Sequence, residues 1–227
     1  MKQILVMGHY DKTDFMMYLG KLLSMDHRVL IVDATQNKDY EFVFPKIDHS
    51  LTMNTHDQFD VMEDVHSYED LMHNLEEQKY DFVLIDCNDE ASLVDWPEVD
   101  FVYVVTSYEN PVIQKNVNLI RAYFQGEKLS SVNLPVTKVI YEVSNHLDEK
   151  YMDSLLDELP LLWKESLVYY PDERDQTLKI INQYKNTVMV KRMSSSYKLV
   201  IKQAVEFILG LETSKVNALW KRAERSN

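Results

Sequence analysis

The sequence of 227 residues has very little glycine and almost no cysteine. Its glycines are Gly8, Gly20, Gly126 and Gly210, and its one cysteine is Cys87. A lone cysteine excludes an intrachain disulfide framework and leaves too little thiol for a zinc cluster. The scarcity of glycine matters because loops that cradle phosphate groups need it to let backbone amides converge. The composition therefore favours a reducing compartment and argues against a glycine-rich binding loop.

Long hydrophobic runs and an excess of positive charge are also missing. The opening stretch MKQILVMGHYDKT holds only a short apolar run, too short for the core of a signal peptide or for a membrane span. Thirty-seven acidic residues against 24 basic ones give a net charge of −13, which repels nucleic acid. We expect a cytoplasmic protein that makes no direct contact with nucleic acid.

Hydrophobic residues make up 45% of the chain, enough for the core of one large domain. Apolar runs of strand length alternate with amphipathic stretches, which predicts an α/β fold: a doubly wound, mostly parallel sheet flanked by helices. The predicted strands are 3–7, 28–32, 82–85, 101–105, 137–141 and 167–169. The predicted helices are 14–24, 67–78, 111–124, 149–159, 175–184 and 196–211. Residues 37–65 show no sustained period and stay unassigned.

The stretch ILVMGHYDKTDF, followed by an amphipathic helix and HRVLIVDAT, resembles the start of ParA/MinD-type P-loop ATPases of the SIMIBI class, whose loop reads KGGxGKT[TS]. Gly8, Lys12 and Thr13 match that loop. In the family the matching lysine contacts phosphate and the matching hydroxyl helps to hold magnesium. The resemblance therefore implies a P-loop NTPase-like fold and a site for ATP with magnesium.

Departures from the loop pattern weaken the implied activity. Met7 replaces the family's leading lysine, which reaches across a nucleotide-bound dimer, and His9 and Asp11 replace two glycines. Side chains there restrict the backbone angles that a phosphate nest needs. The carboxylate of Asp11 would also repel a polyphosphate at contact distance, by on the order of several kcal/mol at low dielectric. We expect no ATP/Mg binding or only weak binding, and lost or weak hydrolysis.

Two aspartates at predicted strand ends extend the resemblance. Asp33 matches the first acid of the family's DxD pattern, although Thr35 replaces the second, and Asp86 matches the Walker B aspartate, which can meet a magnesium-bound water. The alternative is that both only cap the loops that follow them. The family often places an adenine-facing asparagine at the end of the strand that here reads Tyr141.

The resemblance spans residues 1–210 in order and spacing, because DFVYVVTSYENPVIQKNVNLI and LVYYPDERD match later segments of the family. It implies no catalytic residue and the following cofactor-binding set: Gly8, Lys12, Thr13, Asp33 and Asp86. Thr13 and Asp86 are the implied ligands of a weak magnesium site. The alternative for Lys12 and Thr13 is an ordinary helix start in an unrelated α/β protein.

Other reactive side chains lack partners at useful spacing. Cys87 has no neighbouring histidine in the sequence and is predicted to be a buried small residue. The histidines His49, His56 and His66 are seven and ten positions apart, which makes no local pair of metal ligands. We expect all three to be solvated loop residues.

The segment 213–227 is set apart from the domain 1–212 by its basic, amphipathic character. One predicted helical face carries Val216, Leu219, Trp220 and Ala223, and the rest is rich in lysine and arginine. Such a helix suits peripheral membrane contact through 214–225 or docking to an acidic partner. The alternative is a final helix folded back on its own domain.

Atypical members of the resembled family, the TadZ/CpaE group, serve larger assemblies. The resemblance therefore implies a homodimeric scaffold or localisation factor with protein partners in secretion, pilus or conjugation machinery, and a pseudo-ATPase rather than an enzyme. One alternative is a divergent, slow, partner-stimulated ATPase switch. Another is a small-molecule transferase with its site at the carboxyl ends of the strands.

Overall fold

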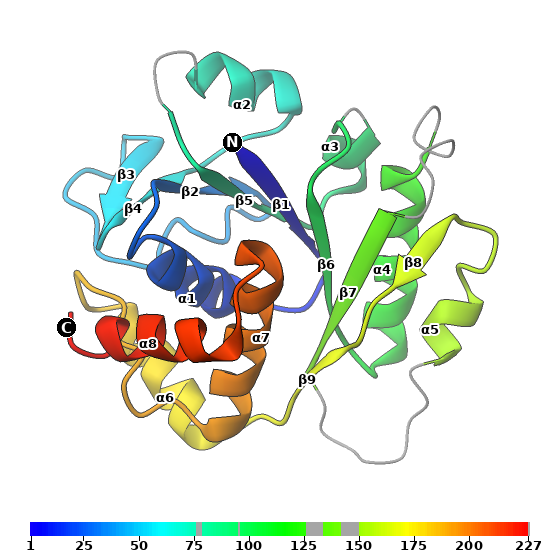
Figure 1. Cartoon of the computed structure of the whole chain (residues 1–227). Coiled ribbons are helices and arrows are strands. Elements are labelled where there is room, and N and C mark those ends of the chain that lie inside the picture. The colour runs from blue at the N-terminus through cyan, green and yellow to red at the C-terminus, as the bar shows by residue number, and fades with distance from the viewer. Residues whose placement is uncertain (76–78, 95, 126–133, 142–149, 227) are drawn as a thin grey trace.

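The computed structural model describes residues 1–75, 79–94, 96–125, 134–141 and 150–226 (Figure 1). Within this part of the chain, nine strands form one sheet with the order β3-β4-β2-β5-β1-β6-β7-β8, and β9 pairs with β7. Every pairing is parallel except that of β3 with β4. The predicted α/β class with a doubly wound, mostly parallel sheet is confirmed.

Helices follow β1, β4, β5, β6 and β7 along the chain, as crossover connections between parallel strands require. The strands are β1 (Lys2–Met7), β2 (Val29–Ala34), β3 (Met53–His56), β4 (Phe59–Met62), β5 (Phe82–Cys87), β6 (Phe101–Ser107), β7 (Leu134–Tyr141), β8 (Leu161–Trp163) and β9 (Leu167–Tyr169). The helices are α1 (Thr13–Leu23), α2 (Tyr68–Leu75), α3 (Glu90–Val94), α4 (Asn110–Tyr123), α5 (Lys150–Ser154), α6 (Glu173–Asn182), α7 (Ser195–Leu209) and α8 (Thr213–Ala223).

Hydrophobic cores cover both faces of the sheet. Side chains of β1 alternate between them: Ile4 and Val6 join α1, α7 and α8, while Leu5 and Met7 join α2, α4 and α5. Figure 1 shows the first group of helices, with α6, gathered on one side of the sheet and α4 and α5 on the other. This two-sided burial explains why the central strands read as continuous apolar runs.

All six predicted strands are present, and the predicted helices other than 149–159 lie close to their expected bounds. The prediction missed β8 and α3, and it left β3 and β4 unassigned within 37–65. The helix predicted over 149–159 is wrong in length, because α5 ends at Ser154 and the chain continues with turn-type bonds such as Leu155 N to Met152 O. The expected positions 76–78 and 149 lie outside the described residues.

The last helix, α8, folds back on the domain. Val216, Leu219, Trp220 and Ala223 are all buried in the core that α1 and α7 share. The folded-back alternative is therefore confirmed, and the expectation of an apolar face offered to a membrane is wrong, because that face already packs on the chain's own helices. No described helix combines the length and the apolar composition that crossing a bilayer requires.

His56 is a second correction. It ends β3 and is 3% exposed, with its ring between Phe44 and Phe59 at centroid distances of 4.8 and 5.7 Å. His49 and His66 are exposed, as expected. Among the described residues, no group of three or more histidine, cysteine or acidic side chains is placed to hold a metal ion.

Cys87 is fully buried at the end of β5, as predicted. Burial raises the pKa of its thiol to about 12. The thiol is therefore protonated at neutral pH and is a packing group rather than a nucleophile.

Candidate functional site

The loop between β1 and α1 begins at Gly8, where the backbone needs glycine. Its φ is +145°, and a Cβ placed there would lie 2.1 Å from the carbonyl oxygen of Val105. The next amide, that of His9, donates to Asn116 Oδ1 at 2.9 Å, and the Asn116 amide group donates to Val105 at 3.0 Å. The loop is thus fastened to β6 and α4, and the His9 amide already has an acceptor.

Lys12 is 2% exposed and is held inside the loop. Its ammonium lies 2.7 Å from the carbonyl oxygen of Gly8 and 2.7 Å from Asp86 Oδ1. Asp86 is fully buried near the carboxyl end of β5, and its Oδ2 accepts the Tyr40 hydroxyl at 2.9 Å. Burial raises the pKa of Asp86 to about 6 although Lys12 opposes the rise, so the ion pair is intact at neutral pH.

Asp33 lies near the carboxyl end of β2, in register with Asp86 on β5. Its Oδ1 accepts the Thr35 amide at 3.0 Å and the Thr35 hydroxyl at 2.5 Å, while its Oδ2 accepts the Tyr40 amide at 3.1 Å. Burial raises the pKa of Asp33, and these bonds counter the rise. Asp33 therefore caps the turn after β2, the loop-capping role that the sequence left open as an alternative. Thr35 is one of its hydrogen-bond partners in that turn.

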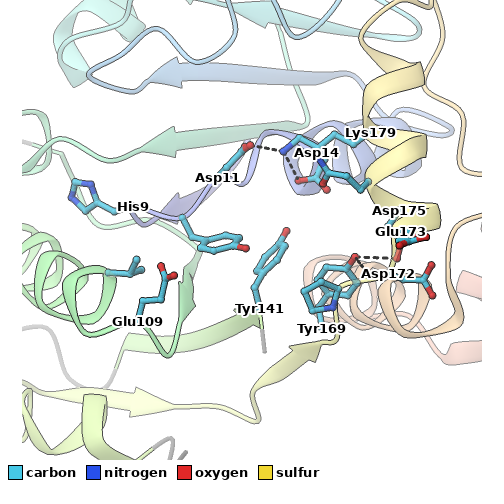
Figure 2. A pocket seen from close by; sticks show the side chains of 14 residues that line it. His9, Asp11, Asp14, Glu109, Tyr141, Tyr169, Asp172, Glu173, Asp175 and Lys179 are labelled. Carbon is cyan, nitrogen blue, oxygen red and sulfur yellow. Dashed lines mark hydrogen bonds and ion pairs between the residues drawn. The ribbon is translucent and has the colours of Figure 1, made fainter. Parts of the chain in front are cut away.

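Thr13 begins α1, and Asp11 covers this helix end. Asp11 Oδ1 accepts the Thr13 amide at 3.2 Å and the Thr13 hydroxyl at 2.9 Å. Short acidic side chains often accept from an amide two residues further along the chain, which explains the local conformation. Asp11 Oδ2 forms an ion pair with Lys179 of α6, as Figure 2 shows.

Of the two implied magnesium ligands, Asp86 does not fit the ion in this arrangement. Magnesium needs oxygen ligands with free lone pairs at octahedral positions. The Thr13 hydroxyl donates to Asp11 and keeps its own lone pairs, but the two oxygens of Asp86 face Lys12 and Tyr40. The ammonium group of Lys12 therefore lies beside Asp86 where a cation would have to be.

A cavity of about 540 Å³ lies beside the loop, and tyrosines form one wall of it. Tyr10 packs on Tyr141 with ring centroids 4.6 Å apart, and Tyr169 lies 5.0 Å from Tyr141 on the other side. The Tyr141 hydroxyl shares a 2.8 Å hydrogen bond with that of Tyr197. The position where the family often carries an adenine-facing asparagine thus holds a buried aromatic side chain that is already covered.

The same cavity is strongly acidic (Figure 2). Its lining includes the carboxylates of Asp11, Asp14, Glu109, Asp172, Glu173 and Asp175, and its one lysine is Lys179. Lys179 lies between Asp11 and Asp14, with 3.9 Å from its ammonium to Asp14 Oδ1. Burial raises the pKa of Asp14, whose Oδ2 accepts the Tyr197 hydroxyl at 2.9 Å. This lining repels anions and suits positively charged groups.

The structure brings the predicted set together. Gly8, Lys12, Thr13, Asp33 and Asp86 meet at the carboxyl ends of β1, β2 and β5. The sequence did not point to Tyr40, Asn116 or Lys179, which complete the network. Tyr40 lies in the unassigned stretch 37–65, and Lys179 follows Asp11 by 168 positions, so no local pattern could reveal either.

At the level of sequence, no family model and no curated protein matches the chain. Solved structures do match. The MinC:MinD cell division protein complex of Aquifex aeolicus is similar with a TM-score of 0.65 at 11% identity, covering 93% of this chain and 97% of that one. A ParA family ATPase from Chlorobium tepidum matches with a TM-score of 0.57 at 15% identity, covering 90% and 98%.

A third similar structure is pNOB8 ParA bound to nonspecific DNA, with a TM-score of 0.53 at 11% identity, covering 93% of this chain and 100% of that one. Identities this low show the fold and no more. These likenesses span nearly the whole length of each protein. The chain therefore has the fold of the ParA/MinD-type P-loop ATPases.

Proposed function

We propose that this protein is a pseudo-ATPase: a ParA/MinD-fold scaffold or localisation factor for a larger protein assembly, with ATP hydrolysis lost or weak. The observation that supports this best is the buried ion pair of Lys12 and Asp86. A phosphate could recruit Lys12 only by separating it from Asp86. Leaving one charge of a buried pair uncompensated costs about 3–5 kcal/mol.

The charge of the neighbouring cavity supports the same proposal. Six carboxylates but only one lysine line this cavity, and that lysine already contacts two of the carboxylates. A triphosphate entering here would meet like charge at short range in a partly buried site, where screening is weak. We infer that the protein works with no cofactor, or with weak ATP/Mg binding that does not drive its function.

The proposed partners are proteins. The MinD structure similar to this chain was solved in a complex with MinC, and the charge of −13 disfavours the DNA contact seen for pNOB8 ParA. Exposed apolar side chains such as Phe42, at 72%, and Tyr184, at 79%, offer protein-binding surface. We propose a homodimer in the cytoplasm that belongs to an assembly of the secretion, pilus or conjugation type, as in the TadZ/CpaE group.

We propose peripheral membrane contact through 214–225 only as an electrostatic attraction between exposed basic side chains and an anionic surface. The apolar face of α8 is buried, whereas Lys215, Lys221 and Arg225 are exposed. Arg222 is also exposed but is paired with Asp26. Exposed basic side chains attract an anionic surface by about 1 kcal/mol each near the membrane, too little for stable anchoring by so few of them. Dimerisation would double this contribution.

A second function is a slow ATPase switch that a partner activates. It is favoured by one observation: Gly8, Lys12, Thr13, Asp33 and Asp86 still meet at the ends of β1, β2 and β5. A partner would have to move Asp11 off α1 and turn Lys12 away from Asp86. The second function therefore requires a rearrangement of the loop that the first does not.

Calorimetry with ATP and magnesium, together with an ATPase assay, tests the proposal on the wild type and on Lys12→Ala. We expect no saturable binding at micromolar nucleotide and no turnover above background in either protein. Since Lys12→Ala leaves Asp86 unpaired, Lys12→Ala/Asp86→Asn serves as the folded control, checked by circular dichroism. Micromolar binding by the wild type that both variants abolish would establish the switch instead.

A further inference from the structure

The feature that the proposed function leaves unexplained is the placement of the Asp11 carboxylate. One oxygen accepts both the first amide of α1 and the hydroxyl of Thr13, at 3.2 and 2.9 Å, and the other meets the ammonium of Lys179. Asp11 thus brings one negative charge to a hydrogen-bond donor pair and a cation at once. These are the partners that a bound oxyanion would have.

Two elements that are distant in sequence build this arrangement. The start of α1 contributes free amides and the positive end of the helix dipole. Lys179 reaches the same point from α6, and its ammonium is mostly buried between Asp11 and Asp14 (Figure 2). A lysine with a buried ammonium needs a negative partner, and Asp11 supplies it.

The position remains open to solvent. The side chain of Asp11 is 59% exposed, and Asp11 lines both the tyrosine-walled cavity and a second cavity of about 460 Å³ on the side of Thr13. A small anion in solution could therefore reach the start of α1 if the carboxylate were gone. Access therefore does not limit the binding of an anion here. The limit must come from the Asp11 carboxylate, which fills the position and carries negative charge.

We propose that Asp11 is a tethered anion that occupies an oxyanion site formed by the start of α1 and Lys179. The proposal rests on the proposed function and deepens it, because it names the group that keeps phosphate out. A group fixed in the chain acts at an effective concentration on the order of millimolar or more, so a free anion at lower concentration cannot displace it. The carboxylate also joins α6 to the loop through Lys179, a contact that needs no ligand.

Removing the carboxylate tests this idea directly. Asp11→Gly restores the small residue of the family pattern and frees the Thr13 amide, the Thr13 hydroxyl and Lys179. We expect calorimetry with inorganic phosphate to detect saturable binding to Asp11→Gly, tighter than to the wild type by on the order of tenfold or more. The gain should disappear in Asp11→Gly/Lys179→Met, since that variant lacks the cation.

The matched control is Glu109→Gln, which removes one negative charge from the same cavity without touching α1. It should bind phosphate no better than the wild type. Asp11→Ser is the second variant if the glycine unfolds α1, because serine still accepts from an amide at a helix start. A folded Asp11→Gly or Asp11→Ser protein without any gain in phosphate binding would overturn the proposal, as would an equal gain in Glu109→Gln.

The outcome is separable from that of the proposed function. Binding of ATP with magnesium to the wild type decides whether the protein is a pseudo-ATPase. The difference in phosphate affinity between Asp11→Gly and the wild type decides whether Asp11 occupies the site. Either result can fail while the other holds.

Discussion

Asp33 and Asp86 are register partners on β2 and β5, and Tyr40 connects them through its amide and its hydroxyl. The Tyr40 amide donates to Asp33 at 3.1 Å and the Tyr40 hydroxyl donates to Asp86 at 2.9 Å. Two buried carboxylates side by side would repel each other without such donors. Tyr40 therefore stabilises this pair of buried acids.

Tyr40→Phe should lower the free energy of unfolding at pH 7 by about 1.5–3 kcal/mol, because it removes a hydrogen bond to a buried charge. The matched control is Tyr103→Phe, since the buried Tyr103 hydroxyl donates to a neutral carbonyl, that of Ala204, at 3.2 Å. That change should cost about 0.5–1.5 kcal/mol. Urea unfolding measures both, and equal losses would mean that Asp86 does not depend on Tyr40.

The Lys12–Asp86 pair predicts a strongly non-additive mutant cycle. Lys12→Met or Asp86→Asn alone should destabilise the protein by about 3–5 kcal/mol, because each leaves an unpaired buried group. The double variant Lys12→Met/Asp86→Asn should lose much less than the sum, because no charge remains. Urea unfolding of the four proteins gives the coupling, and additive losses would contradict a direct interaction. Glu158→Gln, which breaks an exposed pair with Arg121, should change nothing measurable.

The sequence predicted the central sheet well because its strands are buried on both faces. Runs such as residues 82–85 are apolar throughout, and no other element of that length fits them. The hairpin of β3 and β4 escaped prediction because polar residues such as Asn54 and Asp60 lie in its short strands at the sheet edge. Such polar and charged residues interrupt the run of apolar residues by which the other strands were recognised.

For the candidate site, the sequence could predict positions but not partners. The loop pattern and the two strand ends placed Lys12 and Asp86 at one edge of the sheet, since parallel strands end together. That Lys12 pairs with Asp86, and Asp11 with Lys179, depends on side-chain geometry and on contacts between distant segments. The carboxylate of Asp11 lies at the start of α1, where the sequence predicted that it would repel a polyphosphate. Its ion pair with Lys179, 168 positions away, could not be predicted from the sequence.

Trp220 tests whether α8 serves the fold or a membrane. Its side chain is almost fully buried, with the ammonium groups of Lys198 and Lys202 at 4.7 and 5.5 Å from the ring centroid. Trp220→Ala should lower the free energy of unfolding by about 3–5 kcal/mol. Leu199→Ala, on the exposed side of α7, should stay within about 0.5 kcal/mol of the wild type. Vesicle flotation with anionic lipid completes the test: a Trp220→Ala protein of unchanged stability that loses vesicle binding would reverse our assignment.

His56 links stability to pH. Burial between two phenylalanines lowers the pKa of His56 to about 4, with nearby Asp57 raising it and Lys21 lowering it. The unfolded chain takes up a proton near pH 6.5, whereas the folded protein does so only near pH 4, so the folded state binds fewer protons in between. Stability from this group is therefore complete above pH 6.5 and is lost as the pH falls towards 4.

From pH 7.5 to pH 4.5, the wild type should lose up to about 3 kcal/mol of unfolding free energy through His56, on top of losses from other groups. His56→Leu removes the titrating ring while keeping an apolar side chain, so its stability should fall less over the same range. His49→Gln is the control, because it removes an exposed imidazole and leaves the buried core unchanged. Urea unfolding at several pH values gives the three curves. If the His56→Leu curve ran parallel to that of the wild type, the buried ring would not be the source of the acid sensitivity, and the charged pair of Lys21 and Asp57 beside it would be the next group to test.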